Sequence, residues 1–203
     1  MPRRVLSNLK ECEDLIRGCL FMGTGGGGSV EWGREVFAEA LDEGLTIEWV
    51  DVDDILDDAW TVTVYGMGSS APPSPETQEE IARQGLVDKL GHRAMDVAVQ
   101  EMGEYAGRKI GAIVPGELGA GNTPSPIVTG ARLGIPVVDG DYAGRAVPEE
   151  LQGTPYLYDK KGWPLASVDG WGNVCIVKDV CNLHMMERIG KMLSVAAYGG
   201  CYI

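Results

Sequence analysis

The 203-residue chain has few positive charges and no long hydrophobic run. Lysine and arginine number 17 against 30 aspartate and glutamate residues, which gives a net charge of −13, and no basic cluster interrupts this acidic excess. The N-terminal Met-Pro-Arg-Arg leads into a charged segment rather than the apolar core of a signal peptide, and no apolar run approaches the length that spans a bilayer. These features argue against nucleic acid and membrane as partners and favour a cytoplasmic protein.

Histidine and cysteine are also scarce, with two and five residues. The cysteines have irregular spacing and form no Cys-x-x-Cys motif, so we interpret them as reduced thiols, most of them in the core. Cys181 and His184 could share a helix face and bind a metal ion, but two ligands do not complete a site.

The order of the expected elements favours an α/β fold. Asn8, Ser29 and Ser74 each precede a helical pattern and are suited to cap its first turn. The expected helices cover 9–20, 30–43, 75–105 (with interruptions) and 123–134, and the expected strands cover 46–50, 60–65, 110–114 and 135–138. Because strands and helices alternate, we predict a three-layer sandwich with a mainly parallel sheet covered by helices on both faces.

The pattern changes from residue 154 onward. Short strands are expected over 156–158, 164–168 and 174–178, followed by a helix over 183–198. We therefore assign 1–153 to the core of an α/β domain, and 154–203 to hairpin-like strands and a terminal helix of the same domain. The last five residues are apolar with no polar tail, and we expect a second domain or a partner chain to cover them.

The expected strand 135–138 ends at a cluster of charged residues. Asp139 and Asp141 follow it directly, and Gly144 and Arg145 come next. In open α/β sheets, ligands bind outside the carboxyl ends of the strands, so these side chains are candidate site residues. The alternative is a simple turn, in which an aspartate bonds its own backbone.

A glycine-rich loop follows the first expected helix. Its backbone N–H groups could approach an anion or an oxygen that gains negative charge, although the loop is a weak match to a dinucleotide fingerprint because a helix, not a strand, precedes it. The alternative is a tight turn between two helices. The candidate substrate-binding residues in this loop are Thr24, Gly25, Gly26, Gly27 and Gly28.

Glu117 and Asn122 follow the expected strand 110–114, at the edge of the sheet where Asp139 and Asp141 are also expected. The alternative is that Asn122 or Thr123 simply caps the next helix. Three neighbouring carboxyl groups would raise one another's pKa, or a divalent metal ion would relieve their repulsion. Glu117, Asp139 and Asp141 are therefore candidate metal ligands, and oxygen ligands alone favour magnesium, calcium or manganese over zinc.

Several of these segments together resemble the DUF917 family, also called the S-methyl thiohydantoin desulfurase family. The resemblance rests on 20–28, on 115–119 with Asn122, on 131–141 and on 144–148. It implies an N-terminal α/β domain, followed in full-length members by a mainly β C-terminal domain that this chain lacks. We therefore expect either a homo-oligomer or a separate subunit that supplies the missing domain. The loop after Tyr65 departs from the family pattern, so the resemblance leaves the substrate open.

The resemblance implies a hydrolase that acts on a small hydantoin-like or thiohydantoin ring and removes its sulfur. In such a site Asp139 or Asp141 would activate water or hold a metal ion, Glu117 would share the proton transfer, and Arg145 would anchor the substrate. Asn122, Gly144 and the glycine-rich loop would contact the ring. The alternative is a non-catalytic or half-site subunit of a hydantoinase-like, oxoprolinase-like or other metabolic complex.

Overall fold

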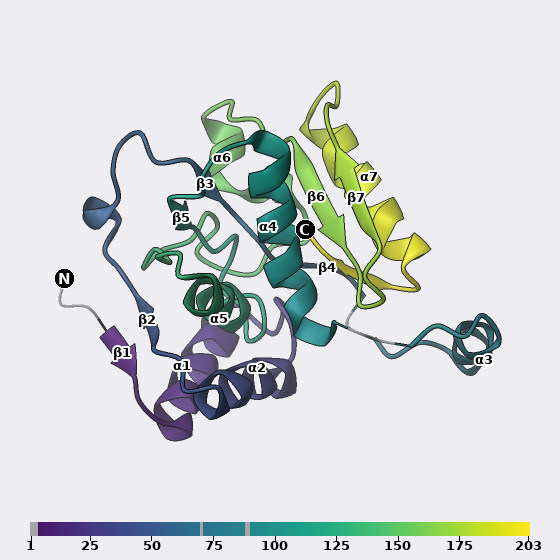
Figure 1. The fold of residues 1–203 in the computed structure, drawn as a ribbon, viewed down its shortest axis with the longest axis horizontal. Helices are drawn as coiled ribbons and strands as arrows, with labels where there is room; N and C mark the ends of the chain where they lie inside the picture. Colours follow the sequence, from purple (N-terminus) through teal and green to yellow (C-terminus); the bar gives the residue numbers. More distant parts are fainter. Residues whose placement is uncertain (1–3, 70, 88–89) are drawn as a thin grey trace.

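The computed structural model describes residues 4–69, 71–87 and 90–203 and has a mixed α/β fold (Figure 1). The helices are α1 (Leu9–Met22), α2 (Val30–Asp42), α3 (Pro75–Arg83), α4 (Ala94–Ala106), α5 (Pro124–Leu133), α6 (Thr154–Leu157) and α7 (Leu183–Ala196). The strands are β1 (Arg4–Leu6), β2 (Ile47–Trp49), β3 (Thr61–Val62), β4 (Gly66–Gly68), β5 (Ala112–Ile113), β6 (Leu165–Val168), β7 (Val174–Val177) and β8 (Gly200–Tyr202). Short 3-10 helices are η1 (Val52–Asp54), η2 (Gly91–Arg93) and η3 (Glu150–Gln152). Within the described ranges, no helix is long and apolar enough to cross a membrane.

The predicted helix starts are confirmed by their caps. The side chains of Asn8, Ser29 and Ser74 accept hydrogen bonds from backbone N–H groups in the first turns of α1, α2 and α3. Each bond satisfies an N–H group that has no partner inside the helix. Gly134 ends α5 in the left-handed conformation, with φ of 65°, which glycine adopts without a steric penalty.

The first half of the chain builds a helical layer against short strands. α1, α2 and α5 pack together around buried Ile16, Phe37 and Val128 (Figure 1). β3 pairs in parallel with β5, and isolated parallel bridges join Ile113 to Val137 and Val50 to Val138. The expected strand 135–138 is thus reduced to two single bridges, one to β5 and one to the residue that follows β2.

The second half contributes most of an antiparallel sheet with the order β4-β8-β6-β7. α4 packs against β6 and β8, while α7 packs against β4 and β8, so the two helices contact the sheet from different sides (Figure 1). β8 lies between β4 and β6, and its Cys201 and the terminal Ile203 are buried. Cys201 and Ile203 are therefore packed within the chain's own fold, while the expected second domain or partner chain stays a prediction.

Two predictions about the fold need correction. The three-layer sandwich with a mainly parallel sheet is not confirmed, because the four-stranded sheet is antiparallel and the parallel pairing is limited to β3, β5 and the two bridges. Residues 156–158 do not form a strand, since α6 begins at Thr154 with Pro155 in its first turn, where proline favours helix initiation. The domain division at 153/154 stays a prediction.

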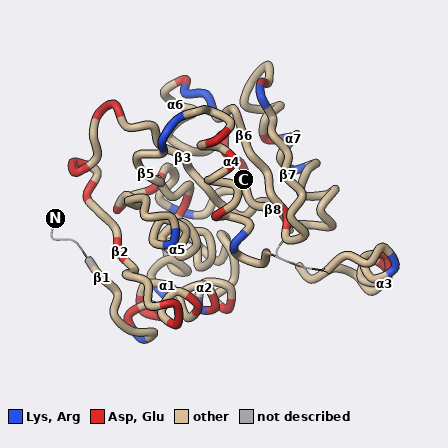
Figure 2. Tube along the Cα trace, in the orientation of Figure 1, with Lys and Arg blue, Asp and Glu red and all other residues tan. Residues whose placement is uncertain are grey.

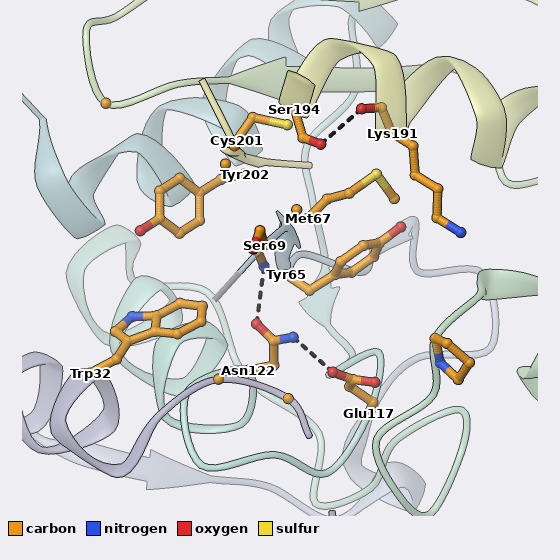
Figure 3. Close-up of a pocket in the computed structure, with 18 of the residues that line it drawn as sticks. Trp32, Tyr65, Met67, Ser69, Glu117, Asn122, Lys191, Ser194, Cys201 and Tyr202 are labelled. Atoms are coloured by element: carbon orange, nitrogen blue, oxygen red, sulfur yellow. Dashed lines mark hydrogen bonds between the residues drawn. The ribbon is translucent and has the colours of Figure 1, made fainter. Parts of the chain in front are cut away.

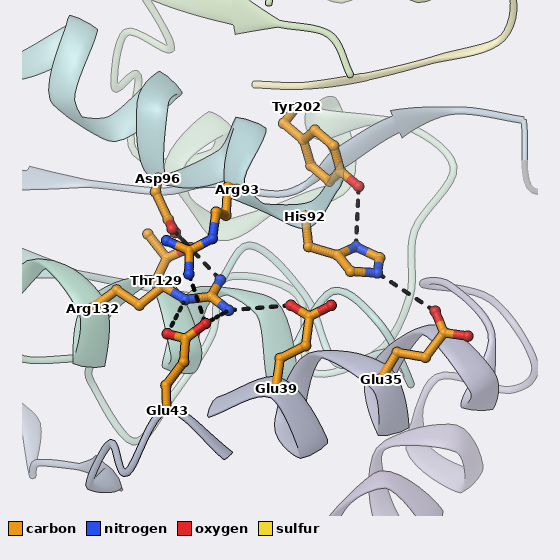
Figure 4. A network of polar contacts seen from close by, with 9 residues as sticks. All are labelled: Glu35, Glu39, Glu43, His92, Arg93, Asp96, Thr129, Arg132 and Tyr202. Atoms are coloured by element: carbon orange, nitrogen blue, oxygen red, sulfur yellow. Dashed lines mark hydrogen bonds and ion pairs between the residues drawn. The ribbon is translucent and has the colours of Figure 1, made fainter. Parts of the chain in front are cut away.

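A charged network joins α2, α4 and α5 (Figure 4). The Arg132 side chain is 6% exposed and pairs through Nη2 with Glu39 at 3.2 Å and through Nε with Glu43 at 3.1 Å. Its Nη1 lies 3.5 Å from Asp96, which accepts a 2.7 Å hydrogen bond from Thr129. Aspartate and glutamate residues also occur along α1, α2 and the loop before β3 (Figure 2).

Candidate functional site

A cavity of about 960 Å³, called the main cavity below, lies where several distant chain segments meet (Figure 3). Its walls come from the end of the glycine-rich loop, the start of α2, residues 65–69, Glu117, Asn122, residues 147–150, α7 and β8. Figure 3 shows Glu117 and Asn122 on one side, Lys191 and Ser194 of α7 on the other, and Tyr65 between them.

Glu117 and Asn122 form a hydrogen-bonded polar pair in the wall of this cavity. Asn122 Nδ2 donates to Glu117 Oε1 at 2.7 Å, and the Val147 backbone N–H donates to Glu117 Oε2 at 2.7 Å. Asn122 Oδ1 accepts the Gly66 N–H at 3.0 Å. Glu117 is only 8% exposed, so these bonds offset part of the cost of burying its carboxyl group. The pair joins three separate segments, and Asn122 does not act as a helix cap, because the cap position of α5 is Thr123.

The glycine-rich loop packs directly against the segment that follows Glu117. The Gly27 carbonyl accepts the N–H groups of Gly121 and Asn122, both at 2.9 Å. A Cβ atom on Gly27 would lie 2.6 Å from the Gly119 Cα, and one on Gly28 would lie 2.5 Å from the Trp32 ring. Close backbone packing therefore explains glycine at these two positions without a ligand.

Only some of the candidate residues in the glycine-rich loop reach the main cavity. Gly27 and Gly28 line the main cavity, whereas Thr24, Gly25 and Gly26 are exposed and lie outside its lining.

The charged residues after residue 138 form a turn in which an aspartate bonds the nearby backbone, which was the alternative to a ligand site. Asp141 Oδ1 accepts the N–H groups of Ala143, at 2.8 Å, and Gly144. Asp139, Gly144 and Arg145 are exposed, and Arg145 Nε donates to the Ala146 carbonyl at 3.3 Å. None of these four candidate residues is part of the lining of the main cavity.

The candidate metal ligands are not brought together as a metal-binding group. Over the ranges that the structure describes, no cluster of three or more histidine, cysteine, aspartate or glutamate side chains could hold a metal ion. Glu117 is held by Asn122 and Val147, while Asp141 is held by its own turn. The carboxyl groups expected to share one sheet edge are thus used by separate local structures.

A second carboxyl group, Glu150 of η3, was missed by the sequence analysis. Burial raises its pKa to about 7; a hydrogen bond with the Tyr65 hydroxyl acts in the opposite direction, and the negative charges of Glu187 and Glu117 add to the increase. Burial, and then the charge of Glu150, also raise the pKa of Tyr65 well above its ordinary value. The Tyr65–Glu150 pair is therefore able to hold a proton near neutral pH.

α7 fixes the position of this pair. Glu187 Oε2 accepts the Glu150 backbone N–H at 3.0 Å, and Glu187 Oε1 pairs with Lys191 at 2.9 Å. Lys191 also lies 3.5 Å from Glu149. The i, i+4 spacing of Glu187 and Lys191 beside buried Met186 was a signal available in the sequence. Glu150 had no comparable local signal, because it reaches the cavity only through the packing of η3 on α7.

An aromatic wall closes another side of the main cavity. The rings of Trp32 and His92 lie 5.9 Å apart and 10° from parallel, and Tyr202 meets Trp32 edge-on. The Tyr202 hydroxyl lies 3.3 Å from His92 Nδ1. Among the described residues, the buried Trp32 Nε1 has no hydrogen-bond partner.

Comparisons with known proteins identify a matching family and a similar solved structure. Residues 10–179 match the family described as "S-Me-THD-like, N-terminal domain". A crystal structure of a protein from Chromobacterium violaceum is similar with a TM-score of 0.75 and 25% sequence identity, over 98% of this chain and 54% of that protein. The chain thus spans about half the length of that protein. No curated protein matches it.

Proposed function

The chain belongs to the S-Me-THD-like family, whose N-terminal domain it matches, and on this premise we propose that it hydrolyses a small hydantoin-like or thiohydantoin ring and removes its sulfur. The observation that supports this best is the buried Glu117–Asn122 pair in the wall of the main cavity. A cavity of about 960 Å³ has room for such a ring together with water.

Ring recognition follows from the unused hydrogen-bonding capacity of this pair. A hydantoin-type ring presents N–H donors and carbonyl acceptors in one plane. Each Glu117 oxygen accepts one protein N–H group and keeps a lone pair for a ring N–H, while Asn122 Nδ2 keeps a second hydrogen for a ring carbonyl. Glu117 is thus a substrate-binding carboxylate that is already oriented before the ring arrives.

The reaction can be written for an S-methyl thiohydantoin. Water adds to the ring carbon of the C=N group, which forms a C–O bond; the C–S bond then breaks, and methanethiol leaves. The sum is substrate plus water giving hydantoin plus methanethiol, with no oxidant or reductant. One group must take a proton from water and one must deliver a proton to the departing sulfur.

The roles expected for Asp139, Asp141, Gly144 and Arg145 stay predictions. These residues would act on the ring only if they reached it from outside the present lining of the main cavity. Thr24, Gly25 and Gly26 also lie outside the lining, so their contact with the ring likewise stays a prediction. Gly27 and Gly28 would border the ring. A divalent metal ion held by Glu117, Asp139 or Asp141 likewise stays a prediction.

An assay of thiol release tests the proposal. The purified chain is incubated with an S-methyl thiohydantoin, and methanethiol is measured with a thiol reagent. We expect turnover by the wild-type chain and a kcat/KM at least about tenfold lower for Glu117→Gln, because a hydrogen bond to a charged group is lost. Glu104→Gln, at an exposed position of α4, is the matched control. Absence of turnover by the wild-type chain contradicts the proposal.

A half-site subunit is the second candidate, since the chain spans about half of the solved Chromobacterium violaceum protein. In that case the lone chain would bind a hydantoin, measured by calorimetry, without releasing thiol from the S-methyl compound. Binding that is lost in Glu117→Gln, together with no turnover, would favour this candidate over the first.

A further inference from the structure

Tyr65 and Glu150 lie in a wall shared by two cavities. Beside the main cavity is a second cavity of about 820 Å³, and Tyr65, Val147 and Glu150 line both. A carboxyl group in a wall between two cavities can be buried within the fold and still meet a bound molecule. Its burial is therefore compatible with chemistry as well as with packing.

The surroundings hold the backbone of Glu150 in place and leave its carboxyl group without a cation. The Glu150 N–H is bound to Glu187, whose charge is compensated by Lys191. Among the residues that the structure describes, no lysine, arginine or histidine forms an ion pair with Glu150 itself. A buried carboxyl group without a cation can exchange a proton at modest cost, whereas one locked in an ion pair cannot.

Glu117 is less suited to this task. Both of its oxygens already accept N–H groups, from Asn122 and from Val147, at 2.7 Å. Moving a proton onto Glu117 would break one of these short bonds and loosen the junction of three chain segments. The two carboxyl groups of the main cavity are thus arranged for different tasks, one for binding and one for proton transfer.

We infer that Glu150 is the proton-transferring residue of this site and that Tyr65 is its hydrogen-bonded partner. The inference rests on the proposed function. Glu150 takes one proton from the water as its oxygen bonds to the ring carbon, and the electron pair of the C=N bond moves onto the ring nitrogen. Glu150 then returns the proton to the sulfur as the C–S bond breaks. The second proton of the water passes from the new hydroxyl to the ring nitrogen, which gives the C=O and N–H groups of the hydantoin. The carboxyl group ends the cycle in its starting state, so the proton balance closes without another reactant. Glu187 is a positioning residue, because it acts through the Glu150 backbone.

The pKa of Glu150, about 7, supports this role, because a general base works best when its pKa is near the working pH. The ionisable groups around it come from several elements. Glu187 and Lys191 lie on α7, Glu149 precedes η3, Glu117 follows β5, and Tyr65 lies just before β4. Glu187 and Glu117 raise the pKa of Glu150, and the hydrogen bond from Tyr65 lowers it.

The test is the pH profile of kcat/KM for methanethiol release from an S-methyl thiohydantoin, between about pH 5 and pH 9. For the wild-type chain we expect kcat/KM to rise with a midpoint near 7, as Glu150 loses its proton. Glu150→Gln should lower kcat/KM by about 100-fold or more and remove this midpoint. Tyr65→Phe should keep a midpoint but move it to higher pH, because the hydrogen bond that lowers the pKa of Glu150 is lost. Glu104→Gln is the matched control.

A second readout does not depend on turnover. In ¹³C NMR spectra of glutamate carboxyl carbons, one resonance should titrate near pH 7 in the wild-type chain, move upward in Tyr65→Phe and be missing in Glu150→Gln. Turnover by the wild-type chain with an unchanged pH midpoint in Glu150→Gln, or in a folded Tyr65→Phe, overturns this inference and leaves the proposed function intact. No turnover by the wild-type chain overturns the proposed function, and this role of Glu150 with it.

Discussion

Arg132 and Glu150 are both largely buried ionisable side chains, but their surroundings differ. Arg132 sits between α2, α4 and α5, and carboxylates from two of these helices meet its guanidinium group within hydrogen-bond or ion-pair distance (Figure 4). Glu150 faces two cavities and interacts with the neutral hydroxyl of Tyr65. The first region uses charge to join helices. The second keeps a carboxyl group available for a ligand.

Burial acts to raise the pKa of the acids in both regions, but only in the first region do cations oppose it. Hydrogen bonds from Arg132, followed by its charge, lower the pKa of Glu43 against the effect of burial. Burial raises the pKa of Asp96, while Thr129 and Arg132 oppose the increase. At Glu150 no cation opposes it, and the pKa reaches about 7. Matched charges indicate a structural role, and an unmatched acid at a cavity wall indicates chemistry.

The largest expected loss of stability is in the charged network around Arg132. Arg132→Met leaves the largely buried Asp96 without its ion-pair partner, while Glu43 keeps its 2.7 Å pair with Arg93. The loss at Asp96 should reduce the free energy of unfolding by about 3 kcal/mol or more. Urea denaturation measures this loss, with Arg108→Met, at an exposed position, as the control. A loss below about 1 kcal/mol, the range of surface pairs, would mean that the network does not hold these helices together.

Glu150, which has no cation partner among the described residues, should make the stability of the chain depend on pH. The folded-state pKa of Glu150, about 7, lies above its ordinary value of 4.5, so its contribution to stability is complete below 4.5 and is lost as pH rises through 7. Between these two pH values, the free energy of unfolding of Glu150→Gln should therefore rise on the order of 3 kcal/mol relative to that of the wild-type chain. Urea denaturation at several pH values measures this gain. A constant difference across the range would show that Glu150 is not the raised acid.

Glycine substitutions compare the cavity wall with an open part of the same loop. Gly27→Ala places a Cβ atom 2.6 Å from Gly119, at a φ of 74°, and should destabilise the chain by about 2 kcal/mol or more. Gly25→Ala has a similar φ, 90°, but no neighbour within 4 Å, so it should cost only about 1 kcal/mol. Thermal unfolding of both variants gives the comparison. Equal losses would remove the packing explanation for Gly27.

The smallest expected effect concerns Lys191, which pairs with Glu187, the residue that accepts the Glu150 backbone N–H. Its side chain is 43% exposed, so solvent weakens the pair, and Lys191→Met should cost about 1 kcal/mol. Lys10→Met breaks a fully surface pair with Asp14 and should cost less. If the two losses in chemical denaturation are the same, the low exposure of Glu187 adds nothing to its bond with Lys191.

Local features of the fold were predictable from the sequence. The caps Asn8, Ser29 and Ser74 mark helix starts because they bond to N–H groups only a few residues away. Glu117 and Asn122 were both candidate residues, since they follow one strand at close spacing, but Glu117 was expected beside Asp139 and Asp141, and its hydrogen bond with Asn122 came from the structure. Asp141 fits the turn alternative for the same reason, because its bonds reach only the next three residues.

Features that join distant segments were not predictable in this way. The last residues were expected to be covered by a second domain or a partner chain, and nothing in the sequence indicated that β8 pairs with β4 and β6. Tyr65 and Glu150 are far apart in sequence, and no periodicity links them. The candidate residues after Val138 were expected at the sheet edge, but their turn lies outside the lining of the main cavity.

The sequence by itself determined the helix starts, the acidic character of the chain, the family and the candidacy of Glu117 and Asn122, because composition, caps and short motifs are features of a few residues each. Only the tertiary structure decided which acid is paired with a cation and which faces a cavity. That choice depends on burial and on neighbours brought together from distant segments, and both arise only when α7, η3 and the strand pairs around β8 have packed.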